Sequence, residues 1–236
     1  MIQYIEETGS TNADLLARIS AGEPVREGAW LVAKRQVSGR GRQGRKWFDG
    51  AGNFMGSTIV RPGPSGPPPA SLALMTGLAV YEAVLACCPD PSALMLKWPN
   101  DVLLQGAKLA GILLESSSDV VVIGIGVNLR AAPDLEERKT IALSQVTTPP
   151  TLEDFAERLE VTFDTELERW RSHGLELLLR RWQAAAHPKG AQLSVHDPSG
   201  EQHIGAYAGL DSSGSLLLRD ADGKTRTIHA GDVELN

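Results

Sequence analysis

The sequence has very little cysteine and no long apolar run, and both absences restrict what the protein can be. Its 236 residues include two cysteines, the neighbours Cys87 and Cys88. Adjacent cysteines rarely bond to each other, and two make no disulfide framework, so we expect a reducing environment. No apolar stretch approaches the roughly 20 residues of a membrane-spanning helix, and the first residues lack the basic and apolar regions of a secretory signal. We therefore predict a cytoplasmic protein that does not associate with a membrane.

The overall charge is negative, which restricts the partners further. The formal net charge is -6, and 42% of the residues are hydrophobic. The length and the apolar content predict one large domain, or one domain with a small appendage. A general nucleic-acid binder is usually basic over a whole face, so we predict no nucleic-acid partner. The five histidines show no metal-ligand spacing, and a histidine metal cluster is not expected.

One segment lacks negative charge altogether. No acidic residue occurs between Gly28 and Phe48, and within this segment Gly39 to Trp47 interleaves three glycines with three arginines and a lysine. Glycine lets backbone N–H groups converge on a ligand, and arginine supplies forked donors for phosphate and carboxylate oxygens. The segment 39–47, called the basic loop below, is therefore predicted to bind a small anion.

The glycines of the basic loop also match the G-x-G-x-x-G dinucleotide fingerprint. That fingerprint requires a helix opening at the last glycine and an acid about 20 residues further on. The residues after Gly44 do not begin a helix, and beyond Asp49 no acid occurs before Glu82. A P-loop is excluded as well, because Arg45 stands where that motif needs lysine and no Ser or Thr follows. The sequence therefore argues against both nucleotide motifs.

The periodicity predicts a mixture of strands and helices, followed by a change of texture. Apolar runs predict strands, and helical spacing of apolar residues predicts helices. The expected strands are 1–6, 29–34, 53–60, 94–98, 102–104, 111–115 and 120–127, and the expected helices are 11–21, 71–88, 152–170 and 175–182. After residue 187 short β-like runs alternate with Asp- and Gly-rich turns, which is typical of a small β-barrel. One of these turns, Asp220 to Gly223, lacks the other ligands of a calcium loop and is interpreted as a hairpin.

Three further motifs stand at the ends of predicted strands. They are Lys97-Trp-Pro-Asn-Asp101, the run Lys108 to Glu115, and Gly124-Ile-Gly-Val-Asn-Leu129. Each has an ordinary structural explanation, since Asp101 and Lys108 can form a salt bridge and an asparagine can end a strand. Strand ends and loops of α/β sheets also often carry binding sites.

Together with Ser10-Thr-Asn12 and the basic loop, these motifs resemble a biotin protein ligase in order and spacing, over essentially the full length. The resemblance implies an α/β fold (α+β), with a mixed-sheet catalytic domain of the biotin/lipoate ligase type over residues 1–186 and an SH3-like β-barrel over 187–236. It implies an enzyme that uses ATP to join biotin to a lysine of a biotin carboxyl carrier protein. Biotinyl-5′-AMP would be the intermediate, with AMP and pyrophosphate as products. A lipoate ligase or octanoyltransferase of the same fold is the alternative.

The resemblance also implies roles for particular residues. Lys108, Arg42 and Asp101 would be catalytic, with Lys108 between the biotin carboxylate and the α-phosphate. Asp101 would either position Mg²⁺ or deprotonate the carrier lysine, and the sequence leaves both roles open. The implied contacts of biotin are Ser10, Thr11, Asn12, Gln36, Arg40, Gly41, Arg42 and Lys108. The implied contacts of ATP are Arg40, Arg42, Arg45, Trp47 (against adenine), Asn100, Lys108 and Asn128.

The resemblance extends to partners. The carrier would be a subunit of acetyl-CoA carboxylase or of a related biotin-dependent carboxylase, and a homodimer is expected. Some members of the family carry an N-terminal helix-turn-helix domain and repress transcription. Here the Ser-Thr-Asn motif begins at Ser10, so we expect a monofunctional enzyme without operator binding.

Overall fold

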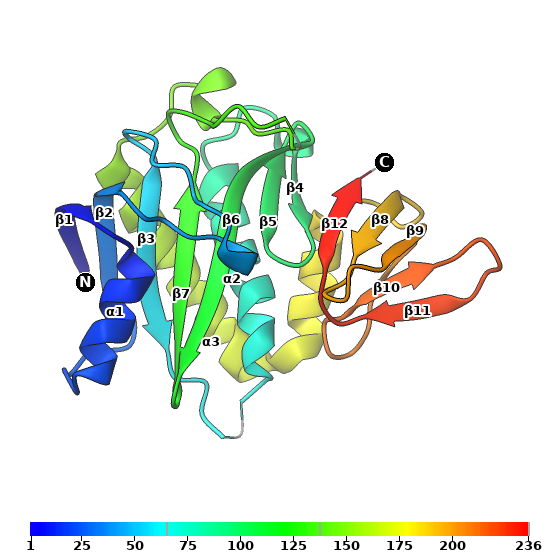
Figure 1. The fold of residues 1–236 in the computed structure, drawn as a ribbon, viewed down its shortest axis with the longest axis horizontal. Coiled ribbons are helices and arrows are strands. Elements are labelled where there is room, and N and C mark those ends of the chain that lie inside the picture. The colour runs from blue at the N-terminus through cyan, green and yellow to red at the C-terminus, as the bar shows by residue number, and fades with distance from the viewer. Residues whose placement is uncertain (65, 137, 236) are drawn as a thin grey trace.

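The chain forms two β-sheets, shown in Figure 1 in a computed structural model that describes residues 1–64, 66–136 and 138–235. The larger sheet has seven strands in the order β1-β2-β3-β7-β6-β5-β4, and the smaller has five in the order β11-β10-β9-β8-β12. The α-helices of the chain are α1 (Thr11–Ser20), α2 (Leu72–Leu85) and α3 (Leu152–Ala185). The strands of the larger sheet are β1 (Ile2–Thr8), β2 (Trp30–Gln36), β3 (Phe54–Val60), β4 (Leu94–Lys97), β5 (Asp101–Leu104), β6 (Ala107–Ser117) and β7 (Val120–Val127). Those of the smaller sheet are β8 (Gln192–His196), β9 (Gln202–Leu210), β10 (Leu216–Arg219), β11 (Thr225–Ile228) and β12 (Asp232–Leu235).

The larger sheet is mixed and is covered on both faces. Strand β1 pairs with β2 in parallel, and the other neighbouring strands pair antiparallel. Helix α1 lies on one face, and α2 and α3 lie on the other (Figure 1). This double covering buries every residue of β3 and explains the continuous apolar run of β7. The predicted α/β fold is confirmed.

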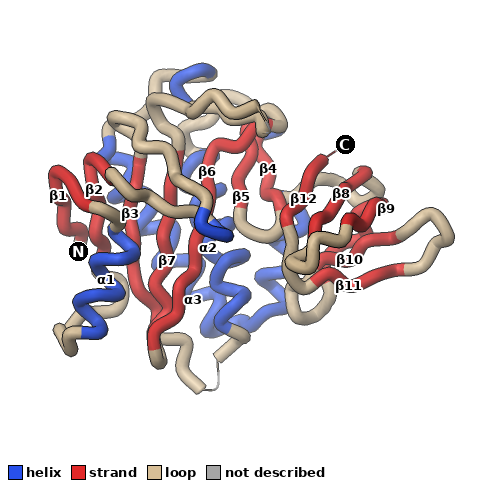
Figure 2. The backbone as a smooth tube through the Cα atoms, in the orientation of Figure 1, coloured by secondary structure: helices blue, strands red, loops and turns tan. Residues whose placement is uncertain are grey.

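Strand β7 presents branched apolar side chains to one face of the sheet and glycines to the other over residues 123–127. Ile123, Ile125 and Val127 belong to the core packed under α2 and α3. Gly124 and Gly126 alternate with them and therefore point to the opposite face. That face stays open beside α1, and the basic loop crosses it (Figure 2).

Helix α3 corresponds to the two helices expected over 152–170 and 175–182. One helical element spans both, but Gly174 within it has φ +69° and ψ -167°. Glycine adopts this backbone conformation without a Cβ clash, so it can interrupt the helix while the chain continues in a second helical segment. Each segment buries a tryptophan, Trp170 and Trp182, in the core.

The smaller sheet is antiparallel, and its turns follow the predicted Asp-rich clusters. Asp197 and Asp211 each accept hydrogen bonds from the backbone two residues further on, at 2.9 Å and 2.8 Å. Asp220 accepts from the N–H of Lys224 at 2.9 Å, which makes the suspected calcium loop a hairpin turn. Asx turns of this kind need no ligand. In the described ranges no helix is both long and apolar enough to cross a membrane.

Replacing Trp170 with alanine should destabilise the protein by about 3–5 kcal/mol, because it leaves a large cavity in the core. The Trp170 side chain is 1% exposed, and its Nε1 donates to Ser71 Oγ at 2.8 Å. Urea unfolding would measure the loss. Val161→Ala on the same helix is the control, since Val161 is 66% exposed and should change stability little. Similar midpoints for the two variants would contradict this packing.

Candidate active site

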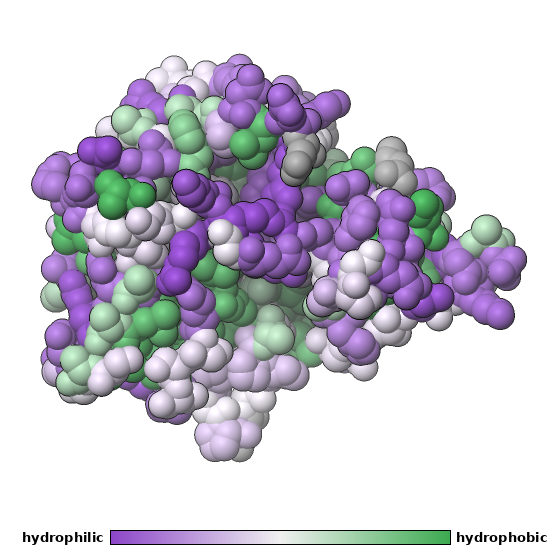
Figure 3. All heavy atoms as spheres, in the orientation of Figure 1, coloured by the Kyte–Doolittle hydropathy of each residue, from purple (hydrophilic) through white to green (hydrophobic). Residues whose placement is uncertain are grey.

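A cleft of about 810 Å³ opens on the face of the larger sheet beside α1, beneath the basic loop and next to the smaller sheet. Hydrophilic side chains gather in the middle of this face (Figure 3). All the residues to which the resemblance assigned a catalytic or binding role line this one cleft: Ser10, Thr11, Asn12, Gln36, Arg40, Gly41, Arg42, Arg45, Trp47, Asn100, Asp101, Lys108 and Asn128. They come from segments more than 100 residues apart, so the fold brings the motifs together. The ligand that each one contacts remains a prediction.

One end of the cleft is a hydrogen-bonded polar network at the start of α1. Ser10 caps this helix, and Thr11 donates to Gln36 Oε1 from its N–H at 2.7 Å and from its hydroxyl at 3.1 Å. The Ser57 hydroxyl lies 2.6 Å from Thr11 Oγ1 and donates to Asn12 Oδ1 at 2.6 Å. Such a network fixes the orientation of buried amide and hydroxyl groups, which then suit a ligand with both donors and acceptors.

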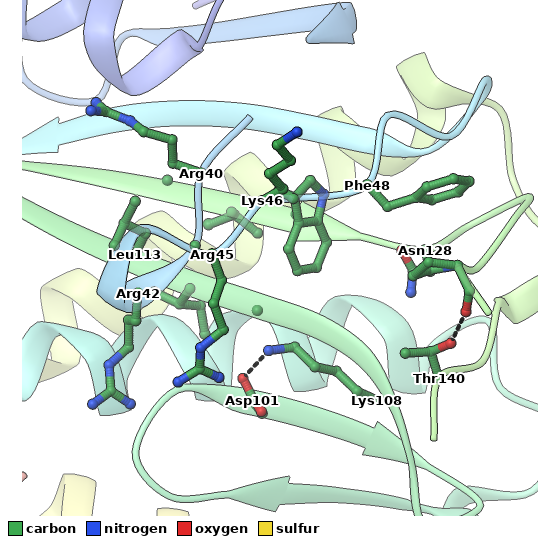
Figure 4. A pocket seen from close by; sticks show the side chains of 18 of the residues that line it. Arg40, Arg42, Arg45, Lys46, Phe48, Asp101, Lys108, Leu113, Asn128 and Thr140 are labelled. Carbon is green, nitrogen blue, oxygen red and sulfur yellow. Dashed lines mark hydrogen bonds and ion pairs between the residues drawn. The ribbon is translucent and has the colours of Figure 1, made fainter. Parts of the chain in front are cut away.

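Asp101 forms ion pairs with two lysines, and its pair with Lys108 lies in the cleft (Figure 4). Lys108 Nζ is 2.6 Å from Asp101 Oδ1, and Lys97 Nζ is 3.4 Å from Oδ2. Burial opposes the charge of the carboxylate, but the attraction of Lys108 and Lys97 outweighs it and holds the pKa of Asp101 below its usual range. For Lys108 burial is the larger effect, and it lowers the pKa of the ammonium although Asp101 partly offsets it.

The basic loop is a tight hairpin. Arg40 and Lys46 form a β-bridge, and the N–H of Trp47 donates to the carbonyl of Gly39 at 2.9 Å. The chain reverses through Gln43 and Gly44, at φ +56° and +72°. The only helical element in the described loop is a three-residue 3-10 turn, Arg42–Gly44, so the helix of a dinucleotide fingerprint does not follow it.

The indole of Trp47 packs against glycine backbone in the cleft. A Cβ on Gly126 would overlap the indole, and one on Gly111 would come within 3.0 Å of it. Lys108 Nζ lies 5.8 Å from the ring centre, a cation–π distance. Gly124 is equally constrained, because a Cβ there would lie 2.5 Å from Asn12 Oδ1. The glycines of Gly124-Ile-Gly126 thus make room on the sheet, a role that the interpretation as a strand end did not include.

The two predicted asparagines are tied to the backbone. Asn100 donates to the carbonyl of Ile112 at 2.7 Å, and Asn128 donates to that of Ile141 at 3.3 Å. Asn100 Oδ1 also accepts from Arg42 Nη1 at 3.0 Å. Their positions are therefore set by the neighbouring strand and loop as well as by any ligand.

Sequence reasoning missed several lining residues. They are chiefly Phe48, Asp49, Asp232 and, from one segment, Pro133, Asp134, Leu135, Glu136, Arg138 and Thr140. The segment has no regular pattern that could have singled it out. Glu115, which accepts from Asn12 at 2.8 Å and from Arg40 at 3.3 Å, was within a quoted motif but received no role.

The cleft combines a polar end, a strip of glycine backbone and several cations. Cations held in fixed positions in a partly buried site stabilise phosphate oxygens and the charge that develops during acyl or phosphoryl transfer. This arrangement is that of an α/β protein whose cleft, covered by a basic loop, suits an anionic substrate.

Comparison with known proteins identifies the family. A model of the Biotin/lipoate A/B protein ligase family matches residues 5–128, and one described as Biotin protein ligase C terminal domain matches 198–236. The chain belongs to the biotin/lipoate A/B protein ligase family. It is 36% identical to a biotin–[acetyl-CoA-carboxylase] ligase of Paracoccus denitrificans, over 97% of this chain and 98% of that one. It is also 36% identical to the enzyme of that name in Mycobacterium tuberculosis, with 98% and 88% of the chains covered.

A solved structure agrees with this. The biotin protein ligase from Aquifex aeolicus in complex with biotin and ATP superposes with a TM-score of 0.87 at 25% identity, covering 100% of this chain and 99% of that one. The predicted membership of the biotin ligase group is thereby confirmed, together with the fold.

Replacing Gly126 with alanine should push Trp47 out of the cleft, because the new Cβ would overlap the indole. The other tryptophans, Trp30, Trp98, Trp170 and Trp182, are at most 3% exposed. Iodide should therefore quench a larger share of the emission in the variant, and a Trp47→Phe background should remove the increase. Gly9→Ala is the control, since nothing lies within 4 Å of a Cβ there. Unchanged quenching would show that Trp47 does not rest on Gly126.

Proposed function

We propose that this chain catalyses the ATP-dependent ligation of biotin to a lysine of a biotin carboxyl carrier protein. The observation that carries the proposal is the cleft itself, in which the five sequence motifs meet around the Asp101–Lys108 pair. The similarity to a structure holding biotin and ATP supports it. So do the relatives, which are named as ligases acting on acetyl-CoA carboxylase.

The first step joins two anions. An oxygen of the biotin carboxylate attacks the α-phosphorus of ATP, the bond to the bridging oxygen breaks, and pyrophosphate leaves. Lys108 would stabilise the charge between the carboxylate and the α-phosphate, and Arg40, Arg42 and Arg45 would neutralise phosphate oxygens. The guanidinium forks of these arginines suit such oxygens.

Biotin would lie at the polar end of the cleft. Its ureido group has donors and acceptors, and the network of Ser10, Thr11, Asn12 and Gln36 offers both. Gly41 and the loop would cover it. On the nucleotide side, Trp47 would pack against adenine, with Asn100 and Asn128 as polar contacts.

In the second step the amine nitrogen of the carrier lysine attacks the acyl carbon of biotinyl-5′-AMP. The bond from that carbon to the phosphate oxygen breaks, AMP leaves, and the nitrogen passes its extra proton to water. A general base works best with a pKa near the operating pH, and the pKa of Asp101 is held below its usual range. We therefore propose that Asp101 chiefly fixes the ammonium of Lys108.

Mg²⁺ remains part of the proposal only as the companion of ATP. Asp101 does not fit a metal ligand well, because each of its oxygens faces a lysine ammonium. The metal-type cluster found in the described residues, Asp197, Glu201 and His203, lies on the smaller sheet outside the cleft lining. No step of this mechanism passes through a metal.

The finer parts of the proposal are a cytoplasmic enzyme, a homodimer, and a catalytic domain over 1–186 followed by a C-terminal domain over 187–236. Both cysteines are free, which supports a reducing compartment. The end of α3 at Ala185 supports the division of the chain. Pyrophosphate release with biotin or lipoate as the only acid substrate tests the function, and release that requires lipoate would favour the alternative.

Lys108→Ala should abolish adenylate formation while the protein stays folded, and Lys189→Ala, on the surface, should retain it. Pyrophosphate release measures both variants.

In the wild type, the rate of adenylate formation should fall as the pH rises through the pKa of Lys108, because the ammonium then loses its positive charge. This loss should occur at a lower pH than the usual lysine pKa of 10.5, since burial lowers the pKa of Lys108. Lys108→Arg should move this alkaline limb to higher pH, since arginine stays protonated. Pyrophosphate release against pH measures both effects, and an unshifted limb would remove Lys108 from that role.

Arg42→Gly should release biotinyl-5′-AMP roughly 10-fold faster or more, the loss expected for a hydrogen bond to a charged group. Free adenylate would be quantified by chromatography, and labelling of bystander lysines should increase with it. Arg26→Gly, in an exposed loop, controls for losing an arginine. Equal release rates for the two variants would refute retention by Arg42.

A further inference from the structure

The smaller sheet contacts the cations of the cleft through three consecutive residues. The Gly231 carbonyl accepts from Arg42 Nη2 at 3.3 Å, and the Val233 carbonyl accepts from Lys97 Nζ at 2.8 Å. Between them, the carboxylate of Asp232 pairs with Arg45 through Oδ2. The beginning of β12 therefore borders the proposed phosphate end of the cleft, and Asp232 lines it.

The conformation of the basic loop determines which of its arginines contact the start of β12, namely Arg42 and Arg45. Arg42 and Arg45 extend from the loop in the same direction, whereas Arg40 extends in another (Figure 4). The reversal at Gln43 and Gly44 produces this, and Gln43 Oε1 accepts from Arg45 at 2.6 Å. Asp232 thus faces a pair of guanidinium groups that the loop has already placed side by side.

Asp232 forms ion pairs with both arginines. Its Oδ1 lies 3.9 Å from Arg42 Nη1, while Oδ2 pairs with Arg45. A carboxylate between two guanidinium groups reduces their mutual repulsion and presents them together. The side chains of Asp232, Arg42 and Arg45 are 31%, 26% and 38% exposed, and ion pairs in contact with water are weak enough to exchange.

We propose that Asp232 is a positioning residue: it holds Arg42 and Arg45 beside the Asp101–Lys108 pair until a phosphate takes its place. The part that concerns phosphate rests on the proposed function, whereas the holding of the loop does not. The smaller sheet thereby sets the position of the basic loop. An incidental surface ion pair would leave the loop and the kinetics unchanged.

Limited trypsin digestion tests the holding without any substrate. The basic loop offers cleavage sites at Arg40, Arg42, Arg45 and Lys46. Asp232→Asn should speed cleavage in 40–46 by roughly threefold or more, the range of an exposed ion pair, measured by mass spectrometry relative to cuts elsewhere. Asp232→Glu keeps the charge and should restore protection. Glu234→Gln is the matched control, because Glu234 is exposed on the same strand and forms no ion pair among the described residues.

The cleavage rates of Asp232→Asn, Asp232→Glu and Glu234→Gln together decide whether Asp232 holds the basic loop. Faster cleavage in Asp232→Asn alone supports the proposal, and equal cleavage in all variants overturns it. A failure of biotin-dependent turnover in the wild type would refute the proposed function but leave this digestion result intact.

A double-mutant cycle tests the route to catalysis. Asp232→Ala should raise the KM for ATP more than it lowers kcat, and its effect should be smaller in an Arg45→Ala background, because one of the two arginines through which it acts is then missing. Additive losses in the double variant would mean that Asp232 merely supports the smaller sheet, and would overturn the positioning role.

Discussion

The buried carboxylate of Asp101, held between Lys97 and Lys108, is the interaction on which the rest of the site depends. It lies at the start of β5, opposite Lys97 at the end of β4. Removing one partner of a buried ion pair leaves an uncompensated charge, which is far costlier than losing a surface pair. Because Lys97 also donates to β12 and Lys108 lies under Trp47, the same triad connects the larger sheet, the smaller sheet and the basic loop.

The sequence identified the elements and motifs of the site because their signals are local. Helix α1 begins at Thr11, where the periodicity predicted a helix, with Ser10 as its cap, and Gly44 allows the positive φ that a tight reversal needs. The strand-end motifs indicated where polar side chains could gather. The family resemblance then predicted one site for them, and in the structure these residues line a single cleft.

The remaining features depend on partners distant in sequence, so no local pattern could give them. Asp232 stands 187 residues from Arg45, and its contact follows from the packing of two sheets. Ser57, which completes the polar network, is one hydroxyl in a buried strand and carries no motif. The sequence shows that residue 126 is a glycine but not why a glycine is needed there. The cause is the indole of Trp47, which contacts Gly126 only when the basic loop folds over the sheet.

Several cations of the cleft are paired with carboxylates, and these pairs lie at different depths. The Asp101–Lys108 pair is nearly dry, with side-chain exposures of 8% and 14%, whereas Glu115 and Asp232, facing Arg40 and Arg45, are 27% and 31% exposed. Coulomb attraction strengthens as water is excluded, so the inner pair should persist while the outer pairs exchange. An arriving phosphate can then replace an outer carboxylate on an arginine without leaving that arginine unpaired. The depth of each pair thus separates the fixed part of the proposed catalytic centre from the part that can close over an activated intermediate.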